Sequence, residues 1–276
     1  MLVARPAAID CCAAASAVVC RCSPASLSRV VLPSSTSRLS VMPAALPTSP
    51  ARLTLWHAVL IPGAMVAVAQ WAASSGTDMN LAARYFDVAS GGFPVRDAWW
   101  AEQFVHKFCK NVLLLIWLGL MVAALAAPKV ARLKPHRRTL WLTVAAMGLG
   151  PTLVTLLKDI NTHVCPWDLK QFGGEAEFSA RWWVSRAEAG RCFPGGHAAG
   201  GFSLIALFFG ARLMGWPRAA WAALVLTLLV GGLFSQVRMM QGAHFLSHNL
   251  WSAAIDWWAA FAVFAPALFS AARTSR

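Results

Sequence analysis

Residues 111–157 read NVLLLIWLGLMVAALAAPKVARLKPHRRTLWLTVAAMGLGPTLVTLL, and this stretch decides the fold. Two apolar runs, Asn111–Ala127 and Thr139–Leu157, flank the short basic segment Pro128–Arg138. A helix needs about 20 apolar residues, and at least about 17, to cross a hydrocarbon core. Four further segments have the same character: Leu53–Ala73, Ala198–Met214, Ala219–Ser235 and Asn249–Phe269. The sequence therefore predicts an all-α fold, a polytopic membrane bundle with six transmembrane helices.

The composition agrees with a protein whose solvent is the bilayer. The chain is 58% hydrophobic and 13% charged, and its 14 Trp residues suit membrane interfaces, where indole rings gather. The net charge of +13 raises the possibility of nucleic-acid binding. However, the basic residues are scattered between apolar runs and no nucleic-acid-binding motif accompanies them, so we expect a membrane partner and no nucleic acid.

The charged residues also predict the orientation of the helices. Basic residues gather in Pro128–Arg138, which has no acid, and recur at Arg218 and in the C-terminal tail. Of the eleven acidic residues, all but Asp10 and Asp256 fall in the opposite set of loops. Because cytoplasmic loops carry an excess of Lys and Arg, we expect both termini to be cytoplasmic in a multi-pass membrane protein.

Residues 1–50 form a different kind of sequence, rich in Ala, Ser, Pro and Arg. An organellar transit peptide is one interpretation, but a sustained amphipathic period is absent. The segment also contains closely spaced cysteines, which lack the paired spacing of a zinc site: Cys11, Cys12, Cys20 and Cys22. We expect a disordered or mis-annotated extension, with Met42 as a possible true start, followed by a membrane domain over residues 51–272.

Three polar clusters lie at one predicted membrane boundary, the outer one. They are Lys158–Asp168, Arg191–His197 and Gln236–His248. Ionisable residues near membrane helices are costly, so clusters of them need a functional reason. Their convergence at one boundary predicts an active site at the outer, periplasmic face.

The residue types in these clusters favour phosphoryl chemistry. The glycines of Pro194–His197 let the backbone approach a ligand, and the helix that follows presents free N–H groups to an anion, although such a turn can also be a simple cap. Lys158 alone could be a lysine that extends to the membrane interface. His244 and His248 are four residues apart, so on a helix they would share one face. A metal-binding HExxH motif is excluded because position 245 is Phe.

These clusters resemble the three motifs of the type 2 phosphatidic acid phosphatase superfamily, KxxxxxxRP, PSGH and SRxxxxxHxxxD. The first motif is similar to Lys158–Pro166 and the second to Pro194–His197. The third is similar to the series Arg238, His244 and His248. Motif order and helix arrangement match over about Leu53 to Phe269, and three motifs in order are more specific than any one.

The resemblance implies a mechanism. His244 would attack phosphorus and form a phosphohistidine, while His197 would protonate the leaving oxygen and later activate water. The phosphate oxygens would be held by two cations and two backbone N–H groups: Lys158, Arg238, Gly195 and Gly196. The resemblance implies no cofactor and no metal.

Several positions depart from the family's motifs. Cys165 replaces the Arg of the first motif, Gly195 replaces the Ser of the second, and Val237 and His248 replace the Ser and Asp of the third. Four residues of this chain are candidates to replace the family groups that are missing. His248 would accept a hydrogen bond from His244, Asp168 or Asp159 would supply negative charge, and Arg191 would replace the lost Arg. An inactive relative of the family remains an alternative.

Cys165 and Cys192 each lie beside a motif, and the motifs must converge to bind one phosphate. Both cysteines belong to the face assigned outside, where an oxidising compartment favours disulfides. We therefore predict a Cys165–Cys192 disulfide, with two buried free thiols as the alternative.

The leading functional hypothesis is a phosphatase acting on a lipid phosphate or diphosphate. Undecaprenyl diphosphate, phosphatidate, phosphatidylglycerophosphate and lipid A are candidate substrates. One alternative is a phosphotransferase that passes the phosphoryl group to lipid A. The other alternative is a non-catalytic transporter or scaffold. A transporter is expected to have polar groups at the bilayer midplane, and Asp256 is one such group.

Overall fold

The computed structural model describes residues 49–274. This part of the chain is helical, with isolated β-bridges in the loops and no β-strand. The predictions for residues 1–50 and for a start at Met42 lie outside the described residues, apart from Ser49 and Pro50.

Five continuous helices in the described range are long and apolar enough to cross a membrane. Three are assembled from consecutive elements: α1 (Pro50–Thr54), η1 (Leu55–Leu60) and α2 (Ile61–Ser74); η2 (Trp100–Cys109) and α4 (Lys110–Ala126); η3 (Lys134–His136) and α5 (Arg137–Lys158). The other two are single helices, α8 (Pro217–Met240) and α9 (Leu246–Thr274). The prediction of an all-α polytopic membrane bundle is confirmed.

The segment expected as the fourth crossing forms two shorter helices in succession, α6 (Gly196–Phe202) and α7 (Ile205–Leu213). Both linking residues keep right-handed helical dihedral angles. The hydrogen bonds across the link span three residues, as in a 3₁₀ turn: Leu204 N–H donates to Gly201 O and Ala206 N–H to Ser203 O. The Ser203 hydroxyl also donates to Gly200 O, at 2.7 Å, which supports the tighter turn.

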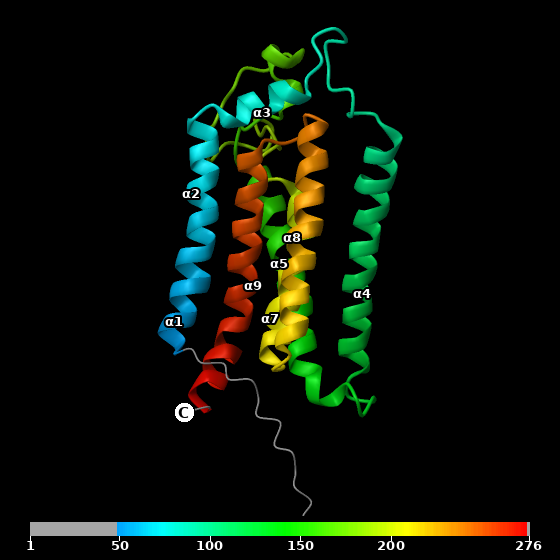
Figure 1. The fold of residues 1–276 in the computed structure, drawn as a ribbon, viewed down its shortest axis with the longest axis vertical. Coiled ribbons are helices and arrows are strands. Elements are labelled where there is room, and N and C mark those ends of the chain that lie inside the picture. The colour runs from blue at the N-terminus through cyan, green and yellow to red at the C-terminus, as the bar shows by residue number, and fades with distance from the viewer. Residues whose placement is uncertain (1–48, 275–276) are drawn as a thin grey trace, which may run out of the picture. The chain divides into compact units, whose positions relative to one another are not determined.

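The two ends of the bundle differ in what they carry (Figure 1). The basic α4–α5 connection lies at the same end as the start of α1 and the C-terminal end of α9. At the opposite end, α3 (Thr77–Tyr85) lies across the bundle beside the long loop that contains η4 (Pro166–Asp168) and η5 (Lys170–Phe172). All three polar clusters belong to this second end, which we call the loop end.

Close packing of α5 against α9 forms the centre of the bundle. Gly150 permits this approach, because a Cβ atom there would overlap the Asp256 carboxyl and lie 3.1 Å from the Asp256 Cα. Asp256 is 1% exposed, and neither carboxylate oxygen has a hydrogen-bond partner among the described residues. An aromatic cluster that includes Phe209, Trp257 and Phe264 packs around the same helices.

Among the helix boundaries that differ from those expected, two place charged residues of the site on helices. The second crossing begins at Trp100 rather than Asn111, and the fifth ends at Met240 rather than Ser235. In both places the extra turns carry charged side chains that lower the local hydropathy. Arg238 therefore lies on the last turn of α8 and not in a loop.

Candidate active site

Four ionisable side chains from four segments converge at the loop end of the bundle. Lys158 is the last residue of α5, His197 lies in the first turn of α6, and Arg238 lies in the last turn of α8. His244 lies in the turn just before α9. Each of the other three is close enough to His244 for its charge to act on that imidazole. The three motifs therefore meet in space.

Lys158 lies against the turn Pro194–His197, which we call the glycine turn. A Cβ atom built on Gly196 would be 3.3 Å from Lys158 Cε and 3.7 Å from Nζ. The ammonium donates to the carbonyl of Arg191 at 3.1 Å, which holds it at the mouth of the turn. The Gly196 N–H has no partner among residues 49–274, whereas the Gly195 N–H donates to His248 O at 3.1 Å. Of the two amides expected to bind phosphate, that of Gly196 is therefore free for a ligand, whereas that of Gly195 is already hydrogen-bonded.

Helix α9 fixes the glycine turn from below. The Ser252 hydroxyl donates to Gly195 O at 2.9 Å. The Asn249 side chain fills the space where a Cβ of residue 195 would stand, so a side chain at this position would displace it. Asn249 therefore occupies the space that a side chain at position 195 would need, and Gly195, which stands where the family has Ser, leaves that space free.

Buried polar atoms face this site without a protein partner. His197 Nε2 and Arg238 Nε are both buried and make no hydrogen bond to any described residue. Arg238 is positioned by Gln241, whose Oε1 accepts from Nη1 at 2.9 Å, and by the ring of Trp167, whose centroid is 5.5 Å from the guanidinium carbon. Buried polar atoms usually have partners. An oxyanion between Lys158 and Arg238 would supply acceptors here.

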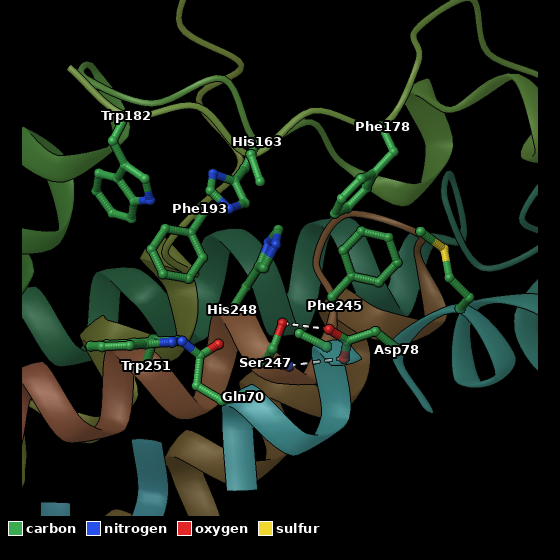
Figure 2. Close-up of a pocket in the computed structure, with 13 residues that line it drawn as sticks. Gln70, Asp78, His163, Phe178, Trp182, Phe193, Phe245, Ser247, His248 and Trp251 are labelled. Carbon is green, nitrogen blue, oxygen red and sulfur yellow. Dashed lines mark hydrogen bonds between the residues drawn. The ribbon is translucent and has the colours of Figure 1, made fainter. Parts of the chain in front are cut away.

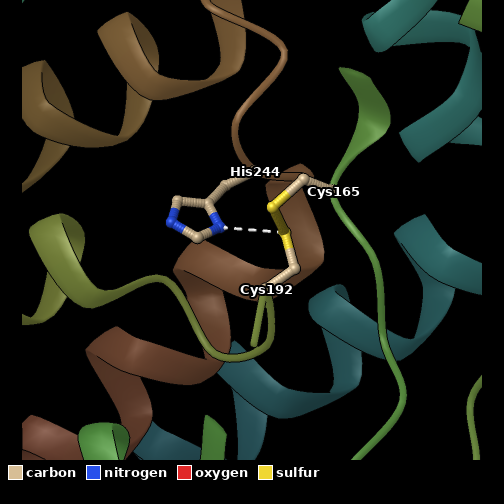
Figure 3. A group of neighbouring side chains, drawn as sticks. All are labelled: Cys165, Cys192 and His244. Carbon is tan, nitrogen blue, oxygen red and sulfur yellow. Dashed lines mark hydrogen bonds between the residues drawn. A yellow bond between two sulfur atoms is a disulfide. The ribbon is translucent and has the colours of Figure 1, made fainter. Parts of the chain in front are cut away.

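His244 is positioned by a disulfide (Figure 3). Cys165 and Cys192 are joined with a Cα–Cα distance of 5.2 Å, and His244 Nδ1 is 3.5 Å from the Cys192 sulfur. A disulfide sulfur carries no hydrogen, so the Nδ1–H of His244 is the donor of this weak hydrogen bond. The other ring nitrogen, Nε2, then carries the lone pair. Burial, assisted by the nearby Lys158 ammonium, holds the pKa of His244 well below its ordinary value. The imidazole is therefore kept neutral, as a nucleophile must be.

The same three side chains could in principle bind a metal. One ligand atom from each of Cys165, Cys192 and His244 lies within 4.8 Å of the others. Metal ligation by cysteine needs thiolates. In the disulfide neither sulfur is a thiolate, so the group does not offer a metal site in this form.

Three of the residues that were expected to replace missing family groups do not make the contacts expected of them. His248 is on α9 while His244 precedes that helix, so the two do not share a helical face. Their ring centroids are 6.0 Å apart and no hydrogen bond joins them, because His244 Nδ1 faces the disulfide instead. The Arg191 guanidinium is 3.6 Å from Asp159, and only its carbonyl reaches the site. Asp168 is exposed in η4 and makes no ion pair within the described range.

Comparison with known proteins supports the motifs. The family model of the PAP2 superfamily matches residues 139–268, which include every site residue named above from Lys158 to Ser252. Residues 139–268 therefore carry a PAP2 superfamily domain. No curated protein and no solved structure matches it significantly. Members of the PAP2 superfamily are generally phosphatases, so membership indicates phosphatase-type activity on lipid phosphate in a multi-pass membrane protein.

Two functional features of this PAP2 chain were missed in the sequence because they lie outside the motifs. The first is Asp78 on α3, whose carboxylate accepts from the Ser247 N–H at 3.0 Å and from the Ser247 hydroxyl. A carboxylate at a helix N-terminus satisfies free N–H groups and complements the helix dipole. Asp78 therefore caps α9 from 169 residues away and fixes the start of the helix that follows His244.

Beside this cap lies a cavity of about 570 Å³ (Figure 2). Aromatic rings, including Phe193 and Trp251, form its walls, and His163 and His248 point into it. His248 Nδ1 is buried and has no partner among the described residues. The residue that stands in place of the family's Asp thus faces this cavity rather than the nucleophile.

The second missed feature is the pair Glu102 and His106 on η2, which packs directly on His197. His106 Nδ1 is 2.8 Å from Glu102 Oε2, and its ring centroid is 4.0 Å from that of His197. The sequence signal was a Glu and a His four residues apart, but only the structure shows what they face.

Proposed function

We propose that this protein is a membrane phosphatase that removes phosphate from a lipid phosphate or diphosphate through a phosphohistidine on His244. Lys158, Arg238 and the Gly196 N–H would hold the phosphate oxygens. His197 would protonate the leaving oxygen and then activate water. Neutral His244 attacks through Nε2, the nitrogen that its Nδ1–H contact with the disulfide leaves free.

One observation carries the choice of a lipid substrate. An open groove of about 560 Å³ begins at Lys158, Gly196 and His197 and continues down the bundle between α4 and α5. Its lower walls are apolar or uncharged and include Trp117, Met147 and Gly200. A phosphate at the upper end would therefore leave a hydrocarbon chain lying along the bilayer-facing walls. His244 is 5% exposed and does not itself line the groove, so we expect the phosphate to reach it past Lys158 and His197.

The orientation belongs to the same proposal. The basic segment Pro128–Arg138 lies at the end of the bundle opposite the site. By the positive-inside rule that end is cytoplasmic, together with both termini, and the site faces the periplasm of a bacterial inner membrane.

A test separates chemistry from lipid recognition. Phosphate release by purified protein is measured on lipid phosphates and diphosphates and on soluble p-nitrophenyl phosphate. Gly200→Leu would fill the groove, because a Cβ there has only Leu113 within 4.0 Å. We expect it to raise KM for lipid substrates about tenfold or more, the cost of roughly 1.4 kcal/mol of lost apolar contact, and to leave the soluble substrate unchanged.

The matched control is Gly232→Leu on α8, where a Cβ meets nothing within 4 Å and the position is exposed. It should behave like the parent on both kinds of substrate. Equal activity of Gly200→Leu and parent on every lipid would exclude the groove as the binding site of the chain. Normal turnover by His244→Ala would exclude the phosphohistidine.

A further inference from the structure

The Glu102–His106 pair is placed as an extension of the active site and not as a surface ion pair. Both residues lie on η2, at the loop end of the second crossing, and outside the residues that the PAP2 model matches. Their side chains are 31% and 21% exposed. The His106 ring meets the His197 ring edge to face, with an interplanar angle of 70°. A carboxylate, an imidazole and the proposed acid histidine are therefore consecutive neighbours.

The two imidazoles meet in a partly enclosed space. Its walls include Val105, Phe234 and Val237, and the His106 side chain is 21% exposed at its edge. His197 Nε2 is buried and has no partner among residues 49–274. Catalytic hydrogen bonds are often unformed in the free enzyme and tighten when substrate binds. The two rings are in contact without a hydrogen bond between them, so direct transfer of a proton requires the rings to align.

The charges around the pair decide which way a proton is held. His197 faces the positive charges of Lys110, Lys158 and Arg238, which oppose a second positive charge on its ring. His106 instead has the Glu102 carboxylate 2.8 Å from its Nδ1. Lys107 lies 3.8 Å from the other Glu102 oxygen, and Arg238 also acts on this carboxylate. The negative charge of the group therefore lies on the His106 side, and the positive charges lie on the His197 side.

We propose that Glu102 and His106 form the proton reservoir of His197, an inference that rests on the proposed phosphatase function. As the P–O bond breaks and the bond from phosphorus to His244 forms, His197 gives one proton to the leaving oxygen. It receives one from His106 on its other nitrogen. When water attacks the phosphohistidine, His197 takes a proton from that water and returns one to His106. Each cycle leaves both histidines as they began.

The experiment compares two leaving groups. Nitrophenolate departs without a proton, whereas the alkoxide of an alkyl phosphate needs one, so only the alkyl phosphate needs the reservoir when the phosphohistidine forms. In His106→Gln and Glu102→Gln we expect kcat for a long-chain alkyl phosphate to fall roughly 10- to 100-fold, below the loss of about 10² to 10⁴ for removing the acid itself. The rate of the first-turnover burst of nitrophenolate from p-nitrophenyl phosphate should stay within about twofold, which also shows that each variant is folded.

Lys107→Gln is the control, because Lys107 contacts Glu102 but not His197, and it should match the parent on both substrates. Equal losses on both substrates, or no loss on either, would overturn the reservoir while leaving the phosphatase intact. No phosphate release by the parent would overturn both proposals.

Discussion

The Cys165–Cys192 disulfide makes a prediction about both stability and catalysis. It closes a loop with a sequence separation of 27 between the end of α5 and the start of α6. Both cysteines are buried, and the bond lies against His244. The perturbation is the double variant Cys165→Ser and Cys192→Ser, which opens the loop and leaves side chains of nearly the same size.

The size of the loss follows from the loop. In the chain-entropy relation, a closed loop of about 28 residues stabilises the folded state by about 3.6 kcal/mol near room temperature. Helix α5 is long and apolar enough to stay in the apolar phase when the rest unfolds, so the open loop remains anchored at that end. The value of about 3.6 kcal/mol is therefore a ceiling, and we expect a loss of about 2–3 kcal/mol. The hydroxyl that replaces the Cys192 sulfur can still accept from the His244 Nδ1–H, so kcat should fall by less than about fivefold, the equivalent of about 1 kcal/mol.

The assay is equilibrium unfolding in mixed micelles of mild detergent and SDS, without reductant, alongside phosphate release. The control is Cys109→Ser, the free cysteine of the described residues, which should leave both measurements unchanged. Unfolding curves of parent and double variant that coincide would refute the reasoning. So would mass spectrometry that finds both thiols free in protein from its native membrane.

Three further predictions follow from other parts of the molecule. A reporter fused within Pro128–Arg138 should be active only if it works in the cytoplasm, and one fused in the loop before α6 only if it works outside; the reverse pattern would invert the proposed topology. Because the pKa of His244 lies well below 6.5, its neutral form persists as pH falls, so the acid limb of kcat/KM should lie below pH 6.5; a His244-dependent limb above 6.5 would contradict this. Gly150→Ala should lower the free energy of unfolding by about 1–3 kcal/mol, measured by the same SDS unfolding, because the added methyl group overpacks α5 against α9. The control Gly119→Ala should not destabilise the protein, because a Cβ atom there has nothing within 4 Å. Equal unfolding curves for the two variants would show that α5 and α9 are not in close contact.

The crossings could be predicted from the sequence because hydropathy over a bilayer-length window is a strong signal. The same signal misplaced the start of the second crossing. Residues 100–109 contain Glu102, His106 and Lys107, which lower the average although the helix continues through them. It also could not show the turn at Ser203–Leu204, because a 3₁₀ link changes hydrogen-bond partners and not composition.

The positions of the site residues could be predicted from motif spacing, but several of their partners could not. Gly195 donates its amide to His248, an interaction set by where α9 passes the turn. The partner of His244 was expected on α9 and lies instead in the loop at Cys192. Asp78 reaches Ser247 across 169 residues, a contact that depends on how α3 lies over the bundle. Such pairings depend on tertiary structure, and no local pattern encodes them.

The central claim is that His244 carries the phosphoryl group, and trapping that intermediate tests it most directly. In His197→Ala, p-nitrophenyl phosphate should still phosphorylate His244, because its leaving group needs no acid, while the missing base slows hydrolysis of the phosphohistidine. Radiolabelled substrate followed by alkaline quenching and peptide mapping should place acid-labile phosphate on His244, and the label should vanish in His197→Ala combined with His244→Ala. Label on another residue, or label that survives removal of His244, would contradict the account.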